Sequence, residues 1–242
     1  MQEMQEMQQT QQTKEMQEIK QIQQMQQIKS NYQSLCNTVS DINQHLPTLC
    51  KYASECQTVA EFGMRSVIST WALLYGLTQS NTENTQTNET TQTNETVKRK
   101  RLTSVDLNYC PRVEEVRNLA KTANIDFSFI MSDDIAIDID TTDLLFIDTW
   151  HVYGHLRREL AKHHSKVSKY IILHDTTVDA LYGETIRLGL NAYEQSIDSG
   201  YPIEEIIRGL WPAVEEFLTA HPEWTLHERY TNNNGLTILK RN

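Results

Sequence analysis

A chain of 242 residues is long enough for one sizeable α/β domain with attachments and too short for two full domains. Its formal net charge of −10 argues against a general binder of nucleic acid or of anionic membrane surfaces. No apolar run approaches a membrane span, the N-terminus lacks the parts of a signal peptide, and the four cysteines have no paired spacing, so we expect a soluble cytoplasmic protein.

Residues 1–29 form a low-complexity segment rich in Gln, Met and Glu. Its apolar residues recur every three positions, and such a stripe drifts by about 60° per step around an α-helix instead of staying on one face. We expect a frayed helix or a disordered tail, with coiled-coil self-association, and hence a homo-oligomer, as the alternative. Residues 30–54 change to helical spacing, as in Leu35, Val39 and Ile42, and are expected to cap the domain.

The domain itself is expected over residues 55–242. It opens with a strand from Thr58, a tight turn that carries Gly63, and a helix whose first turn holds Ser69 and Thr70. Hydroxyl groups in a first helical turn can satisfy free backbone N–H groups, and the start of a helix favours an anionic ligand group. A single glycine in such a turn is more often structural than ligand-binding, so this turn alone indicates little.

The stretch 79–97 contains a direct repeat of TQTNET and almost no hydrophobic residue, which is typical of a disordered surface insertion. Two strands follow it, one ending at Asp106 and one ending at Ser132. A helix from about Pro111 to Ala123 is predicted between them, with the proline in its first turn.

Two short apolar runs, Leu144–Ile147 and Tyr170–Leu173, flank a helical pattern in which Leu156, Leu160 and Val167 share one side. Continuous apolar runs suit strands buried on both faces, and a helix between two of them makes a βαβ unit. The chain then closes with a helix and an Asn-Gly turn between two short strands, which predicts a hairpin. We therefore predict a Rossmann-like, doubly wound α/β fold with a mostly parallel seven-stranded sheet, a C-terminal antiparallel hairpin and N-terminal helices.

Acidic and polar side chains follow the strands of this predicted sheet. Asp148 ends one apolar run, with His151 three residues later, and His174 and Asp175 end the next run. The carboxyl ends of parallel strands meet at the edge where open sheets bind ligands, and an acid after the second strand, here Asp106, sits where nucleotide-binding folds bond ribose hydroxyls. One acid at a strand end is often only a helix cap, but a series of them indicates a site.

The order of motifs VAEFG…ST, VD, SD, DLLFIDTWH and YIILHDTT, followed by a terminal hairpin, resembles the class I S-adenosylmethionine-dependent methyltransferases. The segments FIDTWHVYGHLRREL, YIILHDTT and GLWPAVEEFLTAHPEW are similar to the small, often metal-dependent sugar and macrolide O-methyltransferases and to cephalosporin-hydroxylase-like proteins. Methyltransferases of this kind also occur among the glycan-building proteins of large algal DNA viruses. The resemblance covers roughly residues 55–242, and it implies transfer of a methyl group from S-adenosylmethionine to a hydroxyl of a sugar or glycan, for example of rhamnose type.

The resemblance implies a set of cofactor contacts at the strand ends. An acid–x–Gly turn and a helix-start serine would pack against the methionyl part, the second-strand acid would hold the ribose, and the turn after the third strand would meet the adenine. The matching residues here are Glu61, Gly63, Ser69, Asp106, Ser132 and Asp133. Val67 stands where relatives usually have a glycine, which implies a slightly altered cofactor turn.

In metal-dependent relatives, an acid at the fourth strand and an acidic pair at the fifth bind Mg²⁺, and a histidine three residues after the first acid is the base. Asp148 and His151 fit this pattern, but the pair at the fifth strand is His174 and Asp175, so only one member is a carboxylate. A sugar hydroxyl ionises far above neutral pH, so it needs a base or a cation, and an ordinary histidine with a pKa of about 6.5 can accept a proton at pH 7. Without metal, Asp148 or Asp175 would instead orient the imidazole of His151. Further downstream, the acceptor pocket is expected to include Tyr182, Glu184 and Arg187.

Two other functions stay open at this level. A nucleotide-cofactor oxidoreductase is disfavoured because the first turn lacks GxGxxG and the C-terminal hairpin would be unexplained. A non-catalytic interaction protein with a degenerate methyltransferase core, acting through its Gln-rich segment, is favoured only by Val67 and His174.

Overall fold

The computed structural model describes residues 2–80 and 99–242, and in this part of the chain seven strands form one sheet in the order β3-β2-β1-β4-β5-β7-β6. Neighbours among the first five strands pair in parallel, and β7 lies antiparallel between β5 and β6. The predicted doubly wound sheet with a C-terminal antiparallel hairpin is therefore confirmed. The strands are β1 (Thr58–Phe62), β2 (Lys100–Asp106), β3 (Ile125–Met131), β4 (Thr142–Ile147), β5 (Val167–His174), β6 (Trp224–Tyr230) and β7 (Leu236–Arg241).

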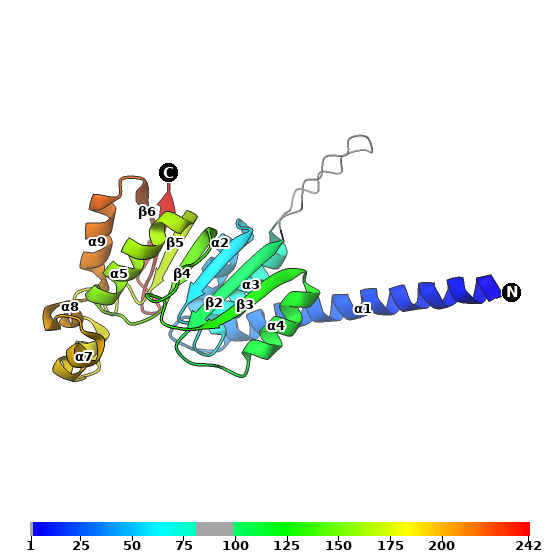
Figure 1. Cartoon of the computed structure of the whole chain (residues 1–242), viewed down its shortest axis with the longest axis horizontal. Coiled ribbons are helices and arrows are strands. Elements are labelled where there is room, and N and C mark those ends of the chain that lie inside the picture. The colour runs from blue at the N-terminus through cyan, green and yellow to red at the C-terminus, as the bar shows by residue number, and fades with distance from the viewer. Residues whose placement is uncertain (1, 81–98) are drawn as a thin grey trace.

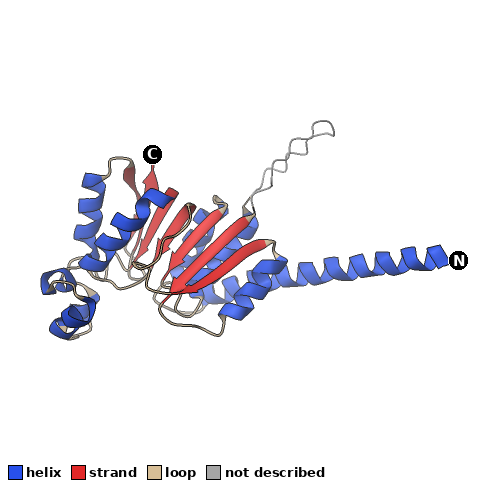
Figure 2. Ribbon diagram, in the orientation of Figure 1, coloured by secondary structure: helices blue, strands red, loops and turns tan. Residues whose placement is uncertain are grey.

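Helices cover both faces of the sheet (Figures 1 and 2). They are α1 (Gln2–Asn37), α2 (Leu46–Ser54), α3 (Ile68–Gln79), α4 (Val113–Thr122), α5 (Tyr153–His163), α6 (Glu184–Arg187), α7 (Ala192–Ser199), α8 (Ile203–Ile207) and α9 (Leu210–Ala220), with 3-10 turns η1 (Asn43–His45) and η2 (His164–Lys166). None of the helices described is both long enough and apolar enough to cross a membrane.

Alternate residues of the central strands build two separate cores. Leu144 and Ile172 pack with α1 to α4 on one face, whereas Leu145 and Ile171 pack with α5 and α9 on the other. Side chains of a strand alternate between the faces of its sheet, so a strand covered on both faces needs a continuous apolar run. This explains why the two runs that flank α5 have no polar interruption.

The long helix α1 crosses the boundary between residues 29 and 30 that composition suggested. Ile28 is completely buried in the core, and Tyr32 and Leu35 pack against it. The N-terminal half of α1 projects away from the domain (Figure 1). Only the second half of this helix is therefore anchored by packing. Most of the predicted insertion at 79–97 lies outside the described residues.

Val167 corrects one detail of the predicted βαβ unit. It is the first residue of β5, where it pairs with Thr142, and α5 has already ended at His163. Placing Val167 on the helix was wrong. The prediction rested on its spacing of seven residues after Leu160, which fits one helical face but does not show that the helix continues. Burial at the start of a central strand accounts for its apolar side chain equally well.

Candidate functional site

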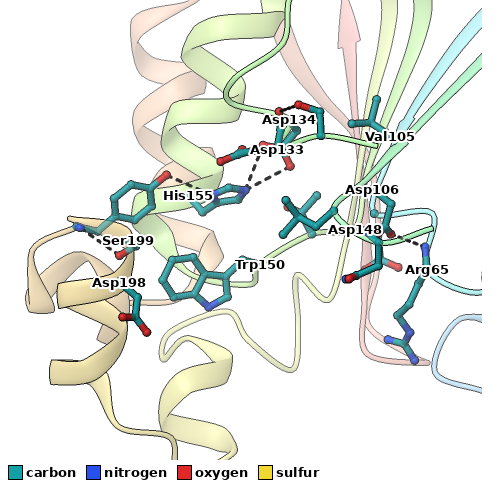
Figure 3. A pocket seen from close by; sticks show the side chains of 16 residues that line it. Arg65, Val105, Asp106, Asp133, Asp134, Asp148, Trp150, His155, Asp198 and Ser199 are labelled. Carbon is teal, nitrogen blue, oxygen red and sulfur yellow. Dashed lines mark hydrogen bonds and ion pairs between the residues drawn. The ribbon is translucent and has the colours of Figure 1, made fainter. Parts of the chain in front are cut away.

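A cavity of about 530 Å³ opens at the carboxyl ends of β1, β2 and β3, beside β4 (Figure 3). Asp106 and Asp148 lie on one side of it, and Asp198 at the end of α7 lies on the opposite side. This volume falls within the range of small-molecule sites. Four residues that the resemblance assigns to the cofactor line the cavity, namely Gly63, Asp106, Ser132 and Asp133.

Gly63 occupies the point where the end of β1 meets the end of β4. Its φ is +82°, and a Cβ atom added there would collide with the backbone carbonyl oxygen of Asp148. Only glycine accepts both the left-handed backbone and so close an approach. The fold therefore requires glycine at position 63, and its lack of a side chain also leaves this part of the cavity wall open.

Asp106 presents its carboxylate to the cavity from the end of β2. Its Oδ2 accepts a hydrogen bond from the backbone N–H of Arg65 at 2.6 Å, and its Oδ1 accepts one from Asn108 at 2.8 Å. An ionised carboxylate has about four acceptor positions, so both oxygens can accept further bonds from a ligand. The two backbone bonds fix the orientation of the carboxylate, as a site for hydroxyl groups requires.

Glu61 and Ser69 lie beneath the cavity and do not line it. The carboxylate of Glu61 is fully buried and accepts hydrogen bonds from the hydroxyls of Ser69 at 2.6 Å, Ser104 at 2.6 Å and Thr70 at 2.9 Å. Burial raises the pKa of Glu61, and the three hydroxyl donors oppose that rise. The hydroxyls at the start of α3 therefore tie the helix to β1 and β2, instead of capping the helix as the sequence suggested.

Val67 precedes the first turn of α3 with φ 61° and ψ 25°, in the left-handed region. This is the position at which the resemblance leads one to expect a glycine. The valine is completely buried in the core below the turn. A left-handed conformation is costly for a β-branched residue, so the structure explains why glycine would suit this position.

An aromatic and acidic wall closes the other side of the cavity. Trp150 stacks on Tyr201 with ring centroids 5.8 Å apart, and His155 places Nε2 3.3 Å from Oδ1 of Asp134. Burial alone would lower the pKa of His155, but the carboxylates of Glu159 and Asp134 raise it to about 9. Sequence reasoning assigned none of these residues to the site. Trp150 stood only two residues after Asp148, whereas Tyr201 carried no local signal.

Next to the cavity, His151 lies between two pairs of carboxylates. Its Nε2 is 3.2 Å from Oδ1 of Asp148 and 3.1 Å from Oδ2 of Asp175. Its Nδ1 is 3.3 Å from Oδ2 of Asp179 and 3.2 Å from Oε2 of Glu184. The predicted trio of Asp148, His151 and Asp175 is thus brought together, and a second acidic pair joins it from the segment after β5.

His174 completes this cluster at the end of β5. Its Nδ1 is 3.1 Å from Oδ1 of Asp148 and 3.4 Å from Oδ2 of Asp175, and its Nε2 is buried without a hydrogen-bond partner in the described protein. Burial alone would lower the pKa of His174, but Asp148 outweighs it and raises the pKa to about 10. The histidine that replaces a carboxylate therefore carries a positive charge at neutral pH.

The same charges act on the partners of His174. Burial alone would raise the pKa of Asp148 and lower that of His151. The neighbouring imidazoles instead hold the pKa of Asp148 below its usual range, and the four carboxylates hold the pKa of His151 well above its usual value. In the protein alone, His151 is therefore an imidazolium.

Of the three residues expected in an acceptor pocket, two belong to the cluster. Glu184 contacts His151, and Arg187 binds both oxygens of Asp179, at 2.6 and 2.8 Å. Tyr182 is 68% exposed and forms an isolated β-bridge with Arg208. Asp179 was not identified from the sequence, although an acid one helical turn after Asp175 was a usable signal.

The residues present fit a divalent cation. Asp148 and Asp175 bring carboxylate oxygens within 4.8 Å of one another beside His151, and Oδ1 of Asp175 is buried without a hydrogen-bond partner in the described protein. Asp175 itself adopts a left-handed φ of 55°, and non-glycine residues in this region tend to occur at functional sites. Carboxylate oxygens are the ligands that Mg²⁺ prefers.

The fold matches solved methyltransferases over most of the chain. An O-methyltransferase from Bacillus cereus in complex with SAH is 12% identical, with a TM-score of 0.51 over 91% of each chain. A candidate caffeoyl-CoA O-methyltransferase from Staphylococcus aureus is 9% identical, with a TM-score of 0.51 over 85% of each chain. A scan against protein-family models and a search of curated proteins each found no match. The chain therefore has a class I methyltransferase fold.

Proposed function

We propose that this protein transfers a methyl group from S-adenosylmethionine to a hydroxyl of a sugar or glycan. The observation that carries the proposal is the position of Asp148, which lines the 530 Å³ cavity and also contacts His151 and His174. A cofactor held in the cavity would meet an acceptor held by the His151 cluster at this residue. Because the fold is that of methyltransferases, the junction is the natural place for methyl transfer.

Residues around the cavity have distinct roles in binding the cofactor. Asp106, oriented by two backbone N–H groups, accepts hydrogen bonds from the ribose hydroxyls, and Ser132 and Asp133 face the adenine. Gly63 allows the methionyl part to approach the backbone. Glu61 and Ser69 support the turn from beneath, through their mutual hydrogen bond.

When bound, S-adenosylmethionine supplies the methyl group on a sulfonium, which is already a good leaving group, so the protein must position the acceptor and take its proton. His151 would accept the proton of the acceptor hydroxyl while that oxygen is held in line with the methyl group. The imidazole must be neutral for this step, although the four surrounding carboxylates favour its charged form. Asp148 and Asp175 therefore have to be engaged by another positive charge before His151 can act as the base.

Mg²⁺ bound by Asp148 and Asp175 would supply this charge and would also stabilise the developing alkoxide. Without the cation, His174 already places one positive charge against Asp148. The remaining acids, Asp179 and Glu184, contact Nδ1, the other nitrogen of the His151 ring, and fix its orientation. Such a polar site suits an acceptor with several hydroxyls, which is the support for a sugar or glycan from this chain's own residues.

Titration calorimetry with S-adenosylmethionine, run with Mg²⁺ and then with EDTA, tests the cofactor assignment. We expect the wild-type protein to bind and Asp106→Ala to lose most of the affinity. Asp126→Ala, an exposed acid at the other end of the neighbouring strand, is the matched control and should bind normally. No binding by the wild type under either condition would refute the proposal and favour the non-catalytic alternative.

Methyl transfer to rhamnose-type and other sugar acceptors tests the chemistry. Replacing His151 with Asn should lower the rate by about 10²–10⁴-fold, the usual contribution of a general base, and leave the affinity for S-adenosylmethionine nearly unchanged. A rate that survives in His151→Asn would show that another group takes the proton.

We also infer a cytoplasmic location, supported by four cysteines that are all free thiols. A homo-oligomer held by α1 stays a proposal. Loss of dimerisation on deletion of residues 1–17, which leaves the buried Ile28 in place and is measured by analytical ultracentrifugation, would support it, and an unchanged state would exclude this role of the helix.

A further inference from the structure

A second cluster of metal-ligating side chains lies far from the cavity. His164 in η2, His221 after α9 and Glu223 before β6 each offer one ligand atom within 4.8 Å of the others. Oε1 of Glu223 is 3.4 Å from Nδ1 of His221 and 3.9 Å from Nδ1 of His164. Tetrahedral Zn²⁺ with nitrogen and oxygen ligands needs ligand atoms about 3.3–3.6 Å apart, so the distance from Glu223 to His221 already fits and the distance from Glu223 to His164 would have to shorten by a few tenths of an ångström.

The two imidazoles pack against each other and against Phe217, and a bound ion would require the rings to separate slightly. Their ring centroids are 4.1 Å apart, and Phe217 packs against both rings, at 5.5 Å from His164 and 4.7 Å from His221. Nδ1 of His164 is buried and has no hydrogen-bond partner in the described protein. A buried polar atom without a partner calls for an explanation, and a coordinated ion provides one.

The nearby Arg241 opposes a cation electrostatically. Its guanidinium donates a hydrogen bond to the carbonyl oxygen of Val167 at 2.7 Å, which holds the side chain in place without removing its charge.

We propose that His164, His221 and Glu223 form a Zn²⁺ site that joins the end of α5 to the connection between α9 and β6. Two imidazoles and one carboxylate are a typical ligand set for zinc, with water in the fourth position. The site stands at the opposite end of α5 from the proposed active site, about 16 Å away along the helix axis. At that distance it has no contact with the proposed reacting groups, and a bound ion would link the end of α5 to the start of β6.

Calorimetric titration of untagged protein with ZnCl₂ tests this site, because a histidine tag would itself bind zinc. The variants are His221→Ala and Glu223→Gln, with His227→Ala as an exposed-histidine control and Asp148→Asn to identify zinc taken up by the active-site cluster. Thermal melts in EDTA establish that all variants fold alike. We expect a binding event that persists in His227→Ala and Asp148→Asn and weakens by more than about tenfold in His221→Ala and Glu223→Gln.

Zinc should also raise the melting temperature of the wild type and of His227→Ala, and raise it less in His221→Ala. Absorption of bound Co²⁺ gives an independent readout, because a tetrahedral site absorbs strongly in the visible region. Equal zinc affinity in His221→Ala and His227→Ala, or no binding by the wild type, would overturn the proposal. Loss of the event in Asp148→Asn would assign the zinc to the other cluster, which would overturn it equally.

Discussion

At the scale of single residues, the left-handed backbone of Val67 predicts that glycine is a less destabilising replacement there than alanine. The residue is fully buried with φ 61°, so alanine would lose the packing and keep much of the strain, whereas glycine would lose the packing and the strain together. We expect Val67→Gly to be more stable than Val67→Ala by about 1 kcal/mol in denaturant unfolding. At Val116, buried inside α4, the usual order should hold, with alanine more stable than glycine by about 1 kcal/mol. Alanine equal to or better than glycine at Val67 would contradict the strain argument.

His174 makes the stability of the protein depend on pH on the alkaline side. Its pKa is about 10 in the folded protein against about 6.5 when unfolded, so its contribution is fully present below about pH 6.5 and is lost as the pH rises through about 10. We expect the free energy of unfolding to fall by on the order of a few kcal/mol from pH 7 to pH 10, and His174→Gln to make this fall clearly smaller, with the remainder coming from His151 and His155, whose pKa values are also raised. Urea unfolding at several pH values measures both slopes, with the exposed His227→Gln as control. If the free energy of unfolding fell equally with pH in His174→Gln and in the wild type, the pKa of His174 would not be raised by Asp148 in the folded protein.

At the scale of elements, α1 combines an anchored half with a projecting half. Met16, Ile19 and Ile22 are 67%, 56% and 58% exposed, whereas Ile28 is completely buried. We expect deletion of residues 1–17 to change the free energy of unfolding by less than about 0.5 kcal/mol, and Ile28→Ala to lower it by about 2–4 kcal/mol. Denaturant unfolding of the two variants beside the full chain decides this. A large loss on deletion would mean that the projecting half carries contacts that stabilise the domain.

The elements also mark the limit of sequence reasoning. The strands and the helix between β4 and β5 followed from apolar runs and spacing, because burial on two faces imposes those patterns directly. The end of α5 did not follow, since Val167 satisfied the helical spacing and the strand equally. The hydroxyls at the start of α3 were predicted to cap the helix, but Glu61 from the adjacent strand is a stronger acceptor for them.

At the scale of the whole molecule, cofactor binding and folding should be linked. The proposed cofactor contacts come from the ends of β1, β2, β3 and β4, so the complete site exists only when the sheet is folded. At a concentration of S-adenosylmethionine about 100 times its Kd, we expect about 2.7 kcal/mol of added stability, seen as a rise of several degrees in the melting temperature. Asp106→Ala should lose this rise and Asp126→Ala should keep it. A rise that Asp106→Ala retains would place the ligand elsewhere.

The sequence by itself determined the fold class, the order of the strands along the chain and the acids that reach one edge of the sheet. These features follow from local periodicity and from the rule that parallel strands end on the same side. Only the tertiary structure decided that Asp179 and Glu184 face His151, that Tyr201 stacks on Trp150, and that Glu61 lies beneath the cavity. Those contacts depend on how the segment between β5 and α9 folds over the sheet edge and on how α3 packs against β1. Residue spacing and hydrophobicity predict local structure, but they do not predict which side chains of distant segments come into contact when the chain packs.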